Sequence, residues 1–471
     1  MTSTTAPTGR PLPAWLKTTV LAAGILVLCW AGAIAYWRSS STAPATPELL
    51  LALLAAPLAL LGLLWVGKKA VSARPQAAAT SGAASAAQPA VNSTPSAPPL
   101  AILAAALRAP HGASPEELAA AIAGNKARPD LDPELVDDDG FPVMSARSED
   151  AVDEALREEF SEWLVLHGLG ELHLGEAQWR ALTLGTAVLR DLANEAFMQL
   201  MPQEGTPPQL RLLPILPASW TVEQRHAAGL WFKHTVAQFG WPVDHLTRID
   251  VAPDAAPAAI LGQFALDSQV PHKRLATIVL ACDSHIAQET VDKWAAGNLL
   301  CTAARAQGCI PGEGAAGMLF TSLEHARHHP DALFAQLYPL LETRREVSSD
   351  SAKRPETKRF TDLAERAVHL GGLELAQVAQ VAADTDHRNS RGLELMGLAS
   401  LALPQLDASA DVLRTGATTG TCGAVPFITA LALARHAALA GNAPVLFVSN
   451  DDPFVCHMAL VGPPPAPVLP A

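Results

Sequence analysis

Apolar residues are arranged differently before and after the first 70 positions of the chain. Residues 18–37 and 49–66 are nearly continuous apolar stretches without a charged side chain. At a rise of about 1.5 Å per residue, a helix over either stretch can cross a hydrocarbon core of about 30 Å. We therefore predict a membrane anchor over residues 1–70 with two transmembrane helices. A cleaved signal peptide is the alternative for the first stretch, but the second apolar stretch close behind it argues against that alternative.

Basic residues predict the orientation of this anchor. Arg10 and Lys17 precede the first stretch, and Lys68 and Lys69 follow the second, whereas the connecting loop contains Arg38 as its only basic residue. Cytoplasmic flanks of membrane helices are enriched in Lys and Arg. The pattern predicts a multi-pass membrane protein with both termini and the following domain in the cytoplasm. The Ala-, Pro- and Arg-leaning composition suggests a bacterial source, so the predicted membrane is a bacterial inner membrane.

The rest of the chain alternates short apolar runs with helical patterns. Residues 71–98 are rich in Ala, Ser and Pro and predict a flexible linker, and residues 463–471 form a Pro-rich tail. Between them, residues 99–462 predict an α/β domain. Strands are expected at 100–107, 210–216, 276–281, 315–320 and 445–448. Helices are expected at 114–123, 149–167, 176–199, 221–239, 287–305, 359–369 and 426–440.

Two of these helices have informative sequences. Ser114 is followed by Pro115 and two glutamates, which is typical of a capped helix start. Residues 427–439 are apolar nearly all round, so this helix should be buried on every side. A helix enclosed between two sheets would have such a sequence.

Composition narrows the functional classes. The net charge of the 471-residue chain is −13 and basic residues are not clustered in the predicted domain, which argues against nucleic-acid binding. Six cysteines are scattered without a C-x-x-C pair, which favours buried thiols in a reducing compartment over a zinc site. No phosphate-binding loop, dinucleotide fingerprint or nucleophile elbow is present. We predict no cofactor and no metal.

Several stretches resemble the thiolase-like fold and, within it, the β-ketoacyl synthases. Residues 308–325 contain a glycine-rich turn with an acidic residue, followed by a strand, and its core is Pro311, Gly312, Glu313 and Gly314. Residues 415–430 resemble the small-residue entry to the buried helix of the second half of these enzymes. The strand at 445–448 with residues 449–460 resembles their last turn and strand. The resemblance implies a layered αβαβα domain.

The catalytic residues of that family do not carry over. The resemblance implies a thiolate nucleophile at a helix N-terminus in the first half, yet the chain has no cysteine from Trp30 to Ala281. Cys282 imitates the local sequence of the nucleophile but lies too close to Glu313. The first active-site histidine should fall within 383–389, where His387 is offset, and the second should fall near Ala417. We predict no catalytic residues, and the reactivity of Cys282 stays open.

Three other groups of residues allow a functional and a structural interpretation. His325, His328 and His329 could bind a metal, although a solvated helix end before Pro330 is favoured. The acidic run 137–140 lacks the ligand spacing of a calcium loop and is better explained as a turn. Trp220, Trp231 and Trp241 are expected in the core, and any that is exposed would be a candidate for partner binding.

The overall plan of anchor, linker and α/β domain resembles a group of proteobacterial accessory proteins found with type VI secretion lipase effectors. That resemblance implies an adaptor or chaperone that binds a phospholipase effector or its spike carrier and catalyses nothing. The alternative is an acyl-transferring or condensing enzyme with a non-standard nucleophile, for which Cys282 is the candidate. A partner that pairs with an active condensing enzyme is a third hypothesis, and a homodimer is also open.

Overall fold

The computed structural model describes residues 97–202, 206–247, 257–268, 275–328, 333–351 and 356–464. The chain divides into two units, Met1–Asn92 and Ser93–Ala471, and everything below concerns the second. The predicted membrane segments, 18–37 and 49–66, lie outside the described residues, as do nearly all of the linker and most of the tail. Within the described ranges, no helix is both long and apolar enough to cross a membrane.

One continuous sheet runs through the domain in the order β10-β9-β11-β12-β7-β1-β6-β5-β4, and β8 pairs with β12. Its first half contains antiparallel pairs of β6 with β1 and β5, and a parallel pair of β5 with β4. The bounds of its strands are β1 Leu100–Arg108, β4 Gln209–Ile215, β5 Leu275–Ser284, β6 Glu313–Ser322, β7 Ala335–Leu337, β8 Leu341–Arg344, β9 Gln380–Ala383, β10 Val412–Arg414, β11 Val445–Ser449 and β12 Val455–Gly462.

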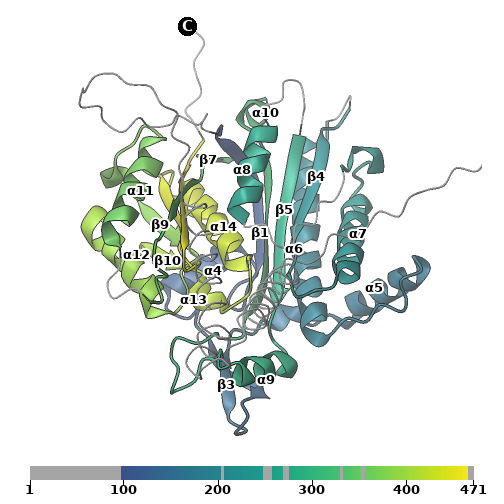
Figure 1. Ribbon diagram of the computed structural model, residues 1–471. Coiled ribbons are helices and arrows are strands. Elements are labelled where there is room, and N and C mark those ends of the chain that lie inside the picture. The colour runs from purple at the N-terminus through teal and green to yellow at the C-terminus, as the bar shows by residue number, and fades with distance from the viewer. Residues whose placement is uncertain are drawn as a thin grey trace, which may run out of the picture. The chain divides into compact units, whose positions relative to one another are not determined.

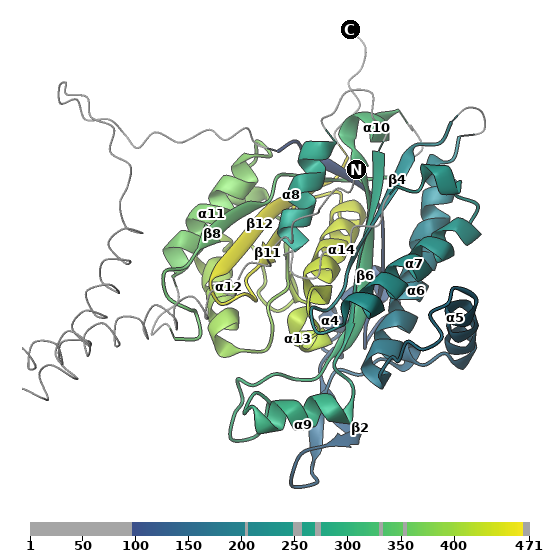
Figure 2. The same ribbon diagram turned by 45° about the vertical axis from the view of Figure 1, so that its right-hand side comes forward.

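Helices form three layers around the two halves of this sheet (Figures 1 and 2). The outer layers are α6 and α7 against the first half, and α11 and α12 against the second. The middle layer contains α4, α8 and α14, whose apolar side chains share one core with both halves. Their bounds are α4 Pro115–Ala123, α6 Glu176–Leu200, α7 Val222–Gln238, α8 Pro257–Asp267, α11 Thr357–His369, α12 Asn389–Ala402 and α14 Val425–Ala440.

Helix α14 accounts for the enclosed apolar sequence. It packs on β1, β5 and β6 on one side and on β9, β11 and β12 on the other. Every residue from Val425 to Ala434 is buried. The prediction of a helix between two sheets is therefore confirmed, because a helix contacted from both sides has no face to offer water.

Local signals explain where several helices begin and end. The Ser114 hydroxyl accepts a hydrogen bond from Glu117 N, which caps α4 as predicted. Helix α9 (Gln288–Ala296) stops well short of the predicted residue 305. Gly297 ends it and Asn298 follows in the left-handed region at φ 54°, a combination that breaks a helix.

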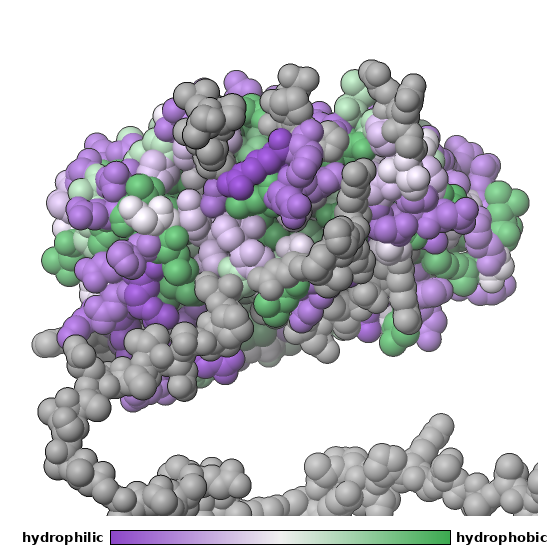
Figure 3. Space-filling model, turned by 90° about the horizontal axis from the view of Figure 1, so that it is seen from above, coloured by the Kyte–Doolittle hydropathy of each residue, from purple (hydrophilic) through white to green (hydrophobic). Residues whose placement is uncertain are grey.

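The remaining elements are short. The hairpin of β2 (Asp130–Val136) and β3 (Pro142–Ser145) forms a separate two-stranded sheet. The predicted helix at 149–167 divides into a 3₁₀ turn, η2 (Glu149–Ala151), and α5 (Glu154–Leu166), which Asp153 caps. The other elements are η3 Val243–His245, α10 Leu323–Arg327, η4 Leu375–Gln377 and α13 Gly416–Thr419. Seen from above, the end of the domain near α10 carries interspersed hydrophilic and hydrophobic side chains (Figure 3).

Candidate functional site

A cavity of about 670 Å³ lies between α8, the start of α14 and the ends of β9 and β11. Its apolar wall includes Leu261 and Ala265 of α8, Phe427 of α14, and the segment that follows β7. Small residues along α8 leave this space open, because alanine and glycine side chains fill little of the gap between helices. The volume is that of a typical small-ligand pocket.

The polar end of this cavity is built around Asp384, which directly follows β9 and is buried. Its carboxylate accepts hydrogen bonds from the Ser449 hydroxyl at 2.6 Å and from the backbone N–H groups of Asn450 at 2.8 Å and Asp451 at 3.2 Å. Burial, followed by the nearby Asp451 charge, raises the pKa of Asp384 to about 7. A carboxyl group that keeps its proton to a much higher pH than an ordinary aspartate therefore faces the cavity.

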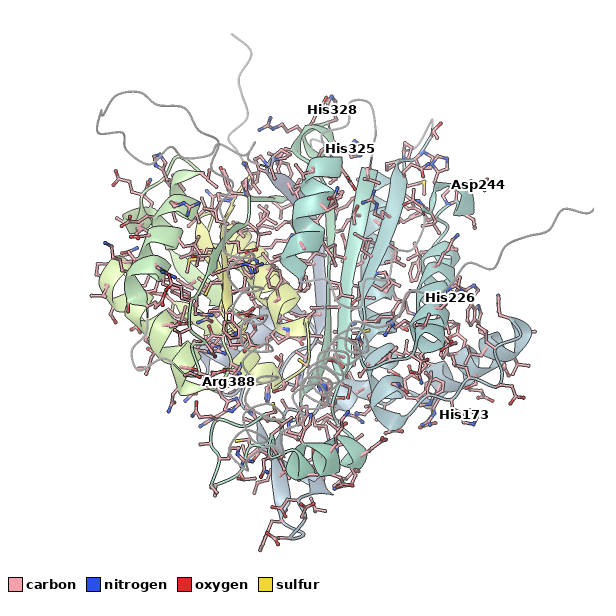
Figure 4. The ribbon with its side chains drawn as sticks, viewed as in Figure 1. His173, His226, Asp244, His325, His328 and Arg388 are labelled. Carbon is pink, nitrogen blue, oxygen red and sulfur yellow. The ribbon has the colours of Figure 1, made fainter. Side chains whose placement is uncertain are left out.

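Arg388 lies beside this carboxyl group and is labelled in Figure 4. Its guanidinium donates to Asp386 and to Asp451 Oδ1, the latter at 2.8 Å. Burial and the Asp386 charge raise the pKa of Asp451, and Arg388 opposes that rise. The cavity thus ends in an acidic cluster, and Arg388 and Arg391 both act on the charge of Asp451.

A buried network beneath the cavity fixes the turn that follows β11. Thr385 and Asn450 are joined by a 2.5 Å side-chain hydrogen bond, and the Asn450 amide also donates to Arg391 O at 3.1 Å. Arg345 donates to both carboxylate oxygens of Glu394, at 3.0 and 2.5 Å, and to Asp452 O. The Asn450 side chain and the Asp452 carbonyl of this turn are therefore held by Thr385, by the backbone of α12 and by Arg345.

The predicted motif turn, Pro311 to Gly314, lies where the two halves meet. The Glu313 carboxylate is fully buried and accepts from Arg180 at 2.8 and 2.6 Å, from Ser284 Oγ at 2.9 Å and from Ser148 N at 2.7 Å. Glu313 thereby joins β6 to α6, β5 and the segment before η2. Its contacts within the domain are those of a structural ion pair.

Gly312 brings the same turn against the second half. A Cβ atom at this position would lie 2.0 Å from Thr419 O and 2.8 Å from the Cα of Gly420. Thr421 N donates to Ile310 O at 2.8 Å, which continues the contact. Only glycine permits this close approach of two backbones.

The surroundings of Cys282, Cys309 and Cys422 do not activate their thiols as nucleophiles. Cys282 is buried on β5 beside Gly185 of α6 and lines neither cavity described here, and burial raises the pKa of its thiol. Cys309 and Cys422 line a smaller adjoining cavity of about 210 Å³. Burial raises the pKa of both of these thiols as well. All three are therefore protonated at neutral pH.

The positions expected for the two active-site histidines carry other residues. Asp384 is the residue that faces the cavity at the end of β9, whereas His387 lies three residues further on and outside its lining. Ala417 lies in α13, where its N–H donates to Thr385 O at 3.0 Å. The segment around Ala417 therefore supports the Asp384 loop.

The three candidate tryptophans are all buried. Trp220, Trp231 and Trp241 are 5%, 1% and 2% exposed and belong to the core between the first-half strands and their outer helices. The Trp231 indole N–H donates to Thr186 Oγ1 at 2.9 Å. The three tryptophans pack in the core, and their contribution to partner binding stays a prediction.

The other candidate ligands are dispersed. His325 lies on α10 and His328 directly follows it, both far from Arg388 (Figure 4), and His329 lies outside the described residues. In the part of the chain that the structure describes, no three His, Cys, Asp or Glu side chains are grouped to hold a metal. The acidic run at 137–140 forms the tight turn between β2 and β3.

Comparison with solved structures places the domain among the ketosynthases by fold. A ketosynthase/chain length factor of ishigamide synthesis aligns at 15% identity and a TM-score of 0.51, covering 78% of this chain and 99% of its own. The module 6 ketosynthase of the Bacillus subtilis 168 bacillaene synthase aligns at 12% identity and a TM-score of 0.54, covering 78% of this chain and 72% of its own. The module 1 ketosynthase from Bacillus amyloliquefaciens FZB42 aligns at 13% and 0.53, covering 79% and 74%.

These likenesses establish a thiolase-like α/β fold of the ketosynthase kind. No protein-family model matches the chain, and no curated protein matches its sequence. The motif turn was predicted from the sequence, whereas the cavity and its acidic end were not. Asp384, Arg388 and Asp451 are brought together only by the parallel pairing of β9 with β11.

Proposed function

We propose that this chain is a non-condensing member of the ketosynthase-like fold that acts as a binding protein. The observation that carries the proposal is the acidic end of the large cavity, where Asp384 and Asp451 meet Arg388. The family resemblance implies a thiolate and two imidazoles for condensation. Asp384 and Asp451 supply neither a thiolate nor an imidazole, and their carboxyl groups, where ionised, repel the negative charge that develops during acyl transfer.

The position of α8 supports the same proposal. Its first residues, Pro257 and Ala258, line the cavity, so a nucleophile just ahead of this helix would be well placed for catalysis. Residues 248–256 read Arg-Ile-Asp-Val-Ala-Pro-Asp-Ala-Ala and contain no Cys, Ser or Thr. The nine residues that precede Pro257 in the sequence therefore include no thiol or hydroxyl side chain.

The partner that we propose is a protein: a type VI secretion phospholipase effector or its spike carrier, for which the chain serves as adaptor or chaperone. The sequence resemblance to accessory proteins of such effectors motivates this choice. The two apolar stretches ahead of the linker would hold the domain at the inner membrane, where a secretion machine is assembled. A binding protein needs no nucleophile, which agrees with the composition of the cavity.

The second candidate is an acyl-transferring or condensing enzyme, and the fold likeness to ketosynthases favours it. It requires a reactive thiol, and Cys282 has a raised thiol pKa and a buried position. The two candidates therefore differ in a measurable property, the covalent loading of a cysteine by an acyl donor.

The test uses the full chain purified in detergent and a thiol-reactive acyl probe at neutral pH. We expect no stoichiometric acylation, and any slow labelling should occur at the half-exposed Cys301 and be lost in Cys301→Ala. Stoichiometric acylation that disappears in Cys282→Ala would establish the enzyme instead. A pull-down from the same detergent extract should recover a lipase effector or spike protein, and recovery of a condensing enzyme would favour a partner subunit of a synthase.

A further inference from the structure

The β2–β3 hairpin and α9 form a small lobe beyond the layered part of the domain (Figures 1 and 2). The lobe has its own apolar core, in which Leu135 and Val143 of the hairpin pack with Val291 of α9. It is attached where Ala146 N donates to Pro311 O at 2.8 Å, next to the motif turn. This lobe contributes no residue to the large cavity.

The opposite face of this hairpin is also apolar, although it is exposed. Leu131 pairs with Met144 across the strands, and Val136 pairs with Pro142, so the four side chains share the outward face. Leu131 is 60% exposed and Val136 is 37% exposed. Pro142 is exposed as well, and Met144 is partly buried. A hairpin with one solvated side ordinarily carries polar residues there.

The tip of the hairpin extends this apolar face. Phe141 is 67% exposed, and the turn before it is fixed by Asp137, whose carboxylate accepts from the backbone N–H groups of Asp139 at 3.0 Å and Phe141 at 2.9 Å. Gly140 closes the turn at φ 80°. Because the turn is rigid, Phe141 is displayed without being free to fold back into the lobe. We call Leu131, Val136, Phe141, Pro142 and Met144 the hairpin face.

Acidic side chains surround the hairpin face. The segment from residue 130 to residue 145 contains six carboxylates and no basic residue. Arg147 pairs with Asp132 at 2.8 Å and with Glu134 at 3.2 Å, which leaves the tip carboxylates uncompensated. Asp138 and Asp139 are exposed and make no ion pair with any described residue. An apolar centre with a negative rim favours a partner of the opposite charge.

We propose that the hairpin face docks a protein segment in which apolar side chains alternate with Lys or Arg. The apolar side chains would cover Phe141 and Val136, and the cations would lie against the tip carboxylates. Anionic membranes and nucleic acids are repelled by this rim. A second copy is disfavoured because the chain carries a net charge of −13. The inference rests on the proposed binding function and names the surface that serves it.

The test measures fluorescence anisotropy of two short labelled peptides with the full chain in detergent. One peptide alternates Leu with Lys, and the other alternates Leu with Glu. We expect the Lys peptide to bind and the Glu peptide not to bind. Phe141→Ser and the double variant Asp138→Asn/Asp139→Asn should each weaken binding by about tenfold, as the loss of a central contact does.

Matched controls keep the result specific. Leu401→Ser removes an equally exposed apolar side chain from α12 (Leu401 is 73% exposed), and Asp362→Asn/Glu365→Gln removes two exposed charges from α11. Neither should change the affinity. Equal binding of both peptides, or equal losses in hairpin and control variants, would overturn the inference. So would a change of oligomeric state in Phe141→Ser, which would identify a second copy as the occupant. Failure of the proposed function would appear separately, as acylation in the probe experiment.

Discussion

The substitution Glu313→Gln should destabilise the domain more than any other single-atom change near the motif turn. Glu313 is 0% exposed, and its carboxylate is the partner of the buried Arg180 guanidinium at 2.6 and 2.8 Å. Glutamine keeps the shape but removes the charge, so a buried cation is left uncompensated. Breaking one side of such a pair costs about 3–5 kcal/mol, whereas Ser284→Ala, which removes one of the other hydrogen bonds, should cost about 1–2 kcal/mol.

Urea unfolding of the full chain in detergent, followed by tryptophan fluorescence, measures these free energies. The midpoint should fall without a change in the m-value. The double variant Arg180→Met/Glu313→Leu should regain most of the loss, because it removes both charges and keeps the volume. A loss below about 1 kcal/mol for Glu313→Gln would refute the assignment of Glu313 to a structural ion pair. So would a double variant whose loss of stability equals the sum of the losses in Arg180→Met and Glu313→Leu.

Three further substitutions test other parts of the structure. The raised pKa of Asp384 means that the folded state holds a proton which the unfolded state releases. The free energy of unfolding should therefore decline by at most roughly 4 kcal/mol as the pH rises from about 4 to about 7. Asp384→Asn should flatten that slope in unfolding curves taken across this range. Gly312→Ala should prevent folding, since its Cβ would meet a backbone oxygen at 2.0 Å, whereas Gly262→Ala, where no atom lies within 4 Å, should be tolerated; the yield of folded chain by circular dichroism compares them. Trp231→Phe should cost about 1–3 kcal/mol by urea unfolding and leave partner capture intact, because its indole is buried and hydrogen-bonded.

The parts of the fold that sequence could predict are those with buried apolar sequences. Uninterrupted apolar runs predicted β5, β6 and α14, because these elements are buried along nearly their whole length. The β2 strand was missed because its sequence, Asp-Leu-Asp-Pro-Glu-Leu-Val, is acidic and contains a proline, which is typical of a loop. Contacts with α9, which lies more than 140 residues further along the chain, stabilise the pairing of β2 with β3.

The candidate site was less predictable because its residues depend on strand order. Asp384 and Asp451 are 67 residues apart, and the parallel pairing of β9 with β11 places the loops after both strands side by side. The family resemblance pointed to residues 383–389 of the same loop, where His387 is offset from the expected position. Which residue of a loop faces a cavity is decided by where the strand ends, and a sequence pattern locates strand ends only to within a few residues.

Strand β1 determines how the domain responds to a pulling force on the chain that precedes it. The strand is paired on both sides, with β6 over its length from Leu100 to Arg108 and with β7 near Leu100. A pull on the chain ahead of Leu100 acts along the strand axis, so the hydrogen bonds to β6 are loaded together in shear and cannot open one after another. Tension on the linker would thus reach the centre of the sheet, and it would also act on the large cavity, because Ala97 and Pro98 ahead of the strand are part of its lining.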